Sequence, residues 1–93
     1  MVAVSINTGL IYLYNNSYPF SLITSFNSNI GNGNSYVDFS HDGTKLLVCG
    51  GNNGGKLISL STYLAVASVS TTSAGTNCRI ASNGQFSIIS NKI

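Results

Sequence analysis

The sequence predicts an all-β fold, and two observations lead to that prediction. Nine short runs rich in Val, Ile, Leu, Tyr and Phe follow one another, each bounded by Gly, Asn, Ser or Asp, as expected for strands separated by turns. Helix-favouring residues are scarce: Glu is absent, whereas the 93 residues include 12 Asn, 15 Ser and 10 Gly, which favour turns and loops. No stretch keeps a helical period of apolar residues.

Two of the expected strands show how their side chains should be distributed. Apolar and aromatic side chains alternate from Ile11 to Tyr14, as in a strand with two different faces. Leu46-Leu47-Val48 is apolar throughout and predicts a strand that is covered on both faces. The nine runs are Val2 to Ile6, Leu10 to Tyr14, Phe20 to Phe26, Tyr36 to Ser40, Lys45 to Cys49, Lys56 to Leu60, Leu64 to Val69, Cys78 to Ala81 and Phe86 to Ser90.

The chain also repeats itself. Asp42-Gly43 and Asn83-Gly84 each separate two apolar runs, as tight hairpin turns do, and they lie 41 residues apart. A second correspondence sets the stretch 9–15 against the stretch 55–61, at an interval of 46 residues. Intervals of this size match one four-stranded propeller blade.

The stretch from Phe39 to Leu47 resembles the first hairpin of a WD-repeat blade, whose usual form is Phe-Ser-Pro-Asp-Gly before a hydrophobic strand. His41 stands in place of the proline. Tyr14-Asn15 and Leu60-Ser61 stand where that family usually ends its third strand with Trp-Asp. The Gly-His pair that normally precedes each blade is missing, so the His–Asp hydrogen-bond network of well-formed members is not expected here.

The stretch from Leu47 to Gly84 resembles the Tyr-Val-Thr-Asn family of propellers nearly as well. Both resemblances imply antiparallel β-propeller blades: a partial blade over 1–33, a full blade over 34–76 and the start of another over 77–93. This is about two and a quarter four-stranded blades, an incomplete ring, because closed propellers have about four to eight. The chain is then a fragment of a longer chain, a self-assembling unit, or a piece that completes another protein's propeller.

The resemblance implies a non-catalytic protein-interaction scaffold that binds protein partners, with a homo-oligomer completing the ring as one possibility. The alternatives are a secreted or surface propeller of Tyr-Val-Thr-Asn or carbohydrate-binding type, and a fragment of a propeller enzyme. Composition supports no nucleic-acid partner, because the net charge of +2 is spread thinly and forms no basic patch. No apolar run reaches the length of a membrane-spanning helix.

No catalytic, cofactor-binding or metal-binding residue is predicted, and no cofactor. Ser40, His41 and Asp42 invite comparison with a catalytic triad, but triads assemble from distant segments, so His41 is expected in an exposed turn. Cys49 and Cys78 lack CxxC spacing and are expected as buried free thiols, which favours the cytoplasm. The aromatic set near the first turn is expected to pack between blades or, alternatively, to form a binding surface: Tyr12, Tyr14, Tyr18 and Phe20, with Pro19.

Overall fold

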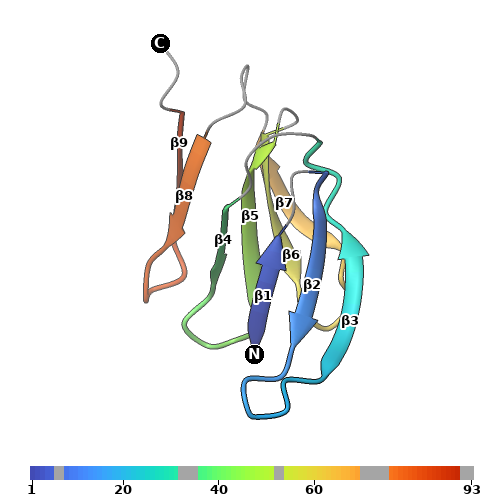
Figure 1. The fold of residues 1–93 in the computed structure, drawn as a ribbon. Helices are drawn as coiled ribbons and strands as arrows, with labels where there is room; N and C mark the ends of the chain where they lie inside the picture. Colours follow the sequence, from blue (N-terminus) through green and yellow to red (C-terminus); the bar gives the residue numbers. More distant parts are fainter. Residues whose placement is uncertain (6–7, 32–35, 52–53, 70–75, 91–93) are drawn as a thin grey trace.

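The computed structural model describes residues 1–5, 8–31, 36–51, 54–69 and 76–90. Within these ranges the chain forms β-strands joined by turns, without a helix. Figure 1 shows the strands arranged in layers, with the strands of residues 36–69 between those of residues 2–27 and those of residues 76–90. The strands are β1 (Val2–Ser5), β2 (Leu10–Tyr14), β3 (Leu22–Asn27), β4 (Tyr36–Phe39), β5 (Lys45–Gly51), β6 (Gly54–Ser59), β7 (Ala65–Val69), β8 (Thr76–Ile80) and β9 (Phe86–Ser90).

The nine strands form three antiparallel sheets in which neighbours in sequence are neighbours in space. The three-stranded sheet has the order β1-β2-β3, the four-stranded sheet the order β4-β5-β6-β7, and the two-stranded sheet pairs β8 with β9. Every strand overlaps one of the nine runs expected from the sequence. The expected all-β fold with antiparallel sheets is confirmed, and no sheet of described strands closes on itself.

Strand β5 lies in the middle layer and is buried on both faces. Leu46 and Val48 belong to the apolar core shared with the three-stranded sheet, whereas Leu47 and Cys49 belong to the core shared with the two-stranded sheet. All four side chains are 0% exposed. Because successive side chains of a strand point to opposite faces, such a strand requires an unbroken apolar run. The two-faced burial expected for this run is confirmed.

The first of these cores holds the three-stranded sheet against the four-stranded sheet. Fully burying each of its large aliphatic side chains contributes about 1.5–3 kcal/mol. The segment after β3 closes one end of this core, because Ser28 donates to the Gly9 carbonyl from its backbone N–H (2.9 Å) and from its hydroxyl (2.6 Å). The buried side chains are Ile11, Leu13, Ile30, Leu46, Val48 and Ile58.

The second core is smaller, and a disulfide bond crosses it. Cys49 on β5 and Cys78 on β8 are joined, with their Cα atoms 6.2 Å apart. Next to this bond, the Asp38 carboxylate accepts a hydrogen bond from the Ile80 N–H at 2.8 Å. The expectation of buried free thiols is therefore right about burial and wrong about pairing. Facing strands of two different sheets bring together cysteines 29 residues apart, which no local spacing reveals.

We expect the disulfide to contribute about 3 kcal/mol to stability, because it restricts the unfolded chain across a loop of intermediate length. Urea unfolding of the oxidised chain and of the double variant Cys49→Ala/Cys78→Ala measures this difference. Reductant should lower the midpoint of the wild-type chain and leave that of the double variant unchanged. Identical wild-type curves with and without reductant would contradict the assignment.

The three-stranded and four-stranded sheets share local irregularities that mark a structural repeat. The β2–β3 pairing shifts register between Leu13 and Tyr14, and the β6–β7 pairing shifts between Leu57 and Ile58, 44 residues later. The sequence comparison placed these strands 46 residues apart. Side chains alternate between the two faces of a strand. Because 44 and 46 are both even, either interval pairs residues that lie on corresponding faces of the two sheets.

Candidate functional site: the cleft between two repeated hairpin turns

The turn between β4 and β5 is built by backbone hydrogen bonds around Ser40–Gly43. The Gly43 N–H donates to the Ser40 carbonyl at 3.0 Å, and the Ser40 N–H donates to the Lys45 carbonyl at 2.9 Å. Gly43 has a φ of 75°, a conformation that glycine adopts without steric cost. The central residues of the turn are therefore His41 and Asp42, and Gly43 closes it rather than standing at its centre.

The Asp42 carboxylate organises this turn. Its Oδ1 atom accepts hydrogen bonds from the Ser40 hydroxyl (2.7 Å), the Thr44 hydroxyl (2.7 Å) and the Thr44 N–H (3.0 Å). These donors favour the ionised form, and the bond from Ser40, followed by those from Thr44, holds the pKa of Asp42 well below its ordinary 3.8. The Ser40 oxygen in turn accepts the Lys45 N–H at 2.9 Å.

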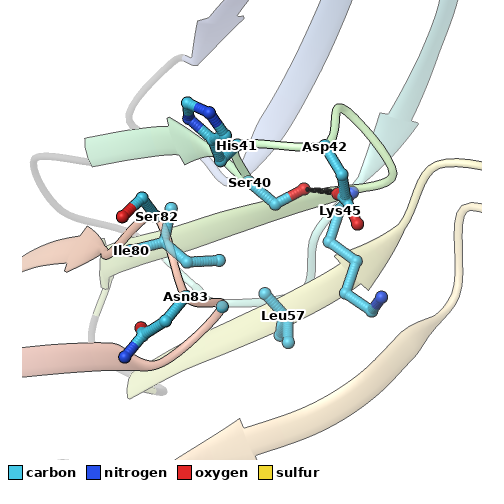
Figure 2. A pocket seen from close by; sticks show the side chains of 9 residues that line it. Ser40, His41, Asp42, Lys45, Leu57, Ile80, Ser82 and Asn83 are labelled. Carbon is cyan, nitrogen blue, oxygen red and sulfur yellow. Dashed lines mark hydrogen bonds between the residues drawn. The ribbon is translucent and has the colours of Figure 1, made fainter.

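The same contacts decide how the candidate triad residues lie. The Ser40 hydroxyl donates to Asp42 and not to an imidazole. His41 is exposed, as expected, and Figure 2 shows its ring pointing away from the Ser40–Asp42 bond. Among the described contacts, no hydrogen bond joins the His41 ring to Ser40 or Asp42. These neighbours in sequence thus form a turn and not the hydrogen-bonded relay of a triad.

The turn between β8 and β9 repeats the first one 41 residues later. The Gly84 N–H donates to the Ala81 carbonyl at 2.9 Å, and Gly84 has a φ of 88°. The Asn83 side-chain oxygen accepts the Gln85 N–H at 3.1 Å, as Asp42 accepts the N–H of the residue two positions later. Ala81 lacks the hydroxyl of its counterpart, so the second turn has fewer side-chain bonds.

A cleft of about 290 Å³ lies between the two turns (Figure 2). Leu57 and Ile80 contribute an apolar part of the lining, while Lys45, Ser82 and Asn83 contribute polar groups. The lining therefore combines hydrogen-bonding groups with a modest apolar surface. Around the cleft and elsewhere in the described ranges, no three His, Cys, Asp or Glu side chains are grouped as a metal site requires.

The aromatic residues of the first turn divide between two environments. Tyr18 is 88% exposed and Phe20 is 53% exposed, with their rings edge to face at 6.2 Å. Tyr12 and Tyr14 are half-buried. The expected packing of the whole set between blades is therefore wrong for Tyr18 and Phe20, which form an exposed surface.

The three-stranded sheet has an apolar face that the sequence analysis did not assign to particular residues. Val2 and Val4 are 41% and 44% exposed, although both lie in a strand. A signal for it was present, because no Asp, Glu, Lys or Arg precedes Asp38.

Comparison with family models, with characterised proteins and with solved structures found no match to this chain. In the described part of the chain, no helix is long and apolar enough to cross a membrane. The structural features that bear on function are therefore those of the chain itself: the stacked sheets, the disulfide bond, the repeated turns and the uncharged face.

We expect the Asp42 hydrogen bonds to make stability depend on acidic pH. Because the folded pKa lies below the ordinary 3.8, the carboxylate stabilises the fold above that value, and the contribution is lost as pH falls below it. Asp42→Asn removes the titrating group and should flatten this part of the pH dependence. Urea unfolding between about pH 5 and pH 2 measures it.

Asn83→Asp is the matched control for this prediction. It adds a carboxylate to the second turn, where Gln85 supplies an N–H donor and no hydroxyl stands at position 81. The dependence of stability on acidic pH that Asn83→Asp adds should be smaller than the dependence that Asp42→Asn removes. An Asp42→Asn variant that keeps the full wild-type pH profile would contradict the role given to Asp42.

We expect His41→Pro to leave stability unchanged or to raise it by up to about 1 kcal/mol. Proline suits the second position of a turn of this kind, and no described hydrogen bond uses the His41 N–H. Gly43→Ala should instead destabilise the chain by about 1 kcal/mol, because its φ of 75° is unfavourable for a residue with a Cβ atom. Thermal unfolding tests both, and a clear loss of stability in His41→Pro would refute this description of the turn.

Proposed function

We propose that this chain is a non-catalytic protein-interaction scaffold module built from propeller blades of WD-repeat type. The observation that carries the proposal is the face-to-face stacking of three antiparallel sheets, with the middle sheet covered on both sides. Blades of propellers are four-stranded sheets arranged around a common axis. Stacking of this kind supports the assignment of the three sheets to three successive blades.

The order of the strands is consistent with one complete blade between two partial ones. The four-stranded sheet corresponds to a complete blade, the three-stranded sheet to the second, third and fourth strands, and the two-stranded sheet to the first and second. The 41-residue repeat of the hairpin turns supports the same assignment, because each turn joins a first strand to a second one. Partial blades leave sheet faces and edges free, and these are natural surfaces for protein partners or for further copies.

The chemistry of the cleft favours binding over catalysis. The Asp42 carboxylate and the Ser40 hydroxyl are engaged in the hydrogen bonds of the turn. A nucleophile needs a neighbouring base that accepts its proton, and in this turn the Ser40 proton goes to a carboxylate that is already bound by Thr44. What the cleft offers a ligand is hydrogen bonding and a modest apolar surface.

A second candidate function is a secreted or surface propeller, of Tyr-Val-Thr-Asn or carbohydrate-binding type. The Cys49–Cys78 disulfide favours it, because disulfides persist in oxidising compartments and are rare in the cytosol. The same bond weighs against the cytoplasmic location that free thiols would favour. The low charged fraction of 6% is consistent with either candidate.

Completing the two-stranded sheet tests the blade assignment. We propose an extended chain in which residue 90 is followed by a second copy of residues 50–69, so that β8 and β9 gain copies of β6 and β7. The added strands should raise the midpoint of thermal unfolding and slow amide exchange in β8 and β9. The control carries the same added residues in scrambled order. Equal protection in both chains, or none in either, would contradict the assignment.

A further inference from the structure

The three-stranded sheet has an outer face that no other described element covers. Here, the outer face means the side chains that point away from the four-stranded sheet. Cross-strand pairing places Val2 opposite Tyr14, Tyr14 opposite Leu22, and Val4 opposite Tyr12. Val2, Val4 and Leu22 are 41%, 44% and 54% exposed, so the face presents aliphatic and aromatic surface to solvent.

The outer face carries no charged side chain. All residues before Asp38 lack acidic and basic side chains, so neither the face nor the free edge of β1 has the charged residues that usually discourage association at sheet edges. An exposed apolar surface without such protection indicates an interaction site.

The molecule itself shows what covers an equivalent face. At the 44-residue interval set by the register shifts, Val2 and Val4 correspond to Leu46 and Val48 of β5. Leu46 and Val48 are 0% exposed, because the three-stranded sheet packs on them. The natural cover for the outer face is therefore the apolar face of another antiparallel sheet.

We propose that this cover is the outer face of a second copy of the same chain, in a two-fold symmetric dimer. In each copy, the inner faces of the sheets are already buried against one another. The far side of the two-stranded sheet carries Arg79 and Ser87, both exposed. Packing that side on Val2 and Val4 would bury the Arg79 cation against aliphatic groups, which is costly. Packing two outer faces together buries no charged side chain.

This inference rests on the proposed function, since it takes stacked sheets as the interaction surfaces, and it adds the identity of the partner. A two-fold axis between the two outer faces would place three sheets on each side, six in all. Two-fold symmetric dimers are the commonest soluble oligomers.

Light scattering coupled to size-exclusion chromatography over a range of concentrations tests the dimer. The wild-type chain should have twice the 9.7 kDa mass of one copy. Val4→Glu should raise the dimer dissociation constant at least about 100-fold, because two-fold symmetry brings two unpaired carboxylates together in an apolar contact. Val66→Glu is the matched control: Val66 lies on β7, is 57% exposed, and should leave the dissociation constant unchanged.

A second variant, Val2→Glu, keeps the test valid if Val4→Glu fails to fold, and circular dichroism identifies the folded variants. A monomeric wild-type chain overturns the dimer, as does a species larger than two copies, or equal weakening by Val4→Glu and Val66→Glu. If the wild-type chain is monomeric but β8 and β9 of the extended chain are protected from amide exchange, only the dimer is overturned. If the wild-type chain is a dimer but the extended chain gains no protection from amide exchange in β8 and β9, the blade assignment is overturned instead.

Discussion

Burial of β5 on both faces is the constraint on which the rest of the structure depends. Its side chains alternate between two apolar cores, so the strand is stable only when one sheet lies on each side. That requirement places the three-stranded sheet against Leu46 and Val48, and the two-stranded sheet against Leu47 and Cys49. The stacking, the position of the disulfide and the cleft between the repeated turns all follow from this arrangement.

The two interfaces are stabilised in different ways. Large aliphatic side chains dominate the first core. The second core has two described strands on one side, so the disulfide and the hydrogen bond from Ile80 to Asp38 supplement a smaller apolar contact. A chain of this size buries a limited share of its surface, and a covalent bond between layers offsets that deficit.

Polar interactions in this protein shape turns, and the surface proposed for association is apolar and uncharged. Three donors surround the Asp42 carboxylate and lower its pKa, and its main effect is to hold the β4–β5 hairpin in one conformation. The repeated turn at Asn83 does this with fewer bonds. Exposed apolar groups lie on the three-stranded sheet, in the loop that follows β2, where Tyr18 and Phe20 extend into solvent, and at Leu64 and Val66 near β7.

The sequence by itself determined the strands, the two repeated turns and the two-faced burial of β5, because each depends on local alternation or on glycine and short polar residues at turns. Only the tertiary structure decided that Cys49 meets Cys78, that Asp38 accepts the Ile80 N–H, and that Val2 and Val4 remain exposed. These features depend on which sheet faces which. Alternation within a strand separates its two faces but does not say what covers either of them.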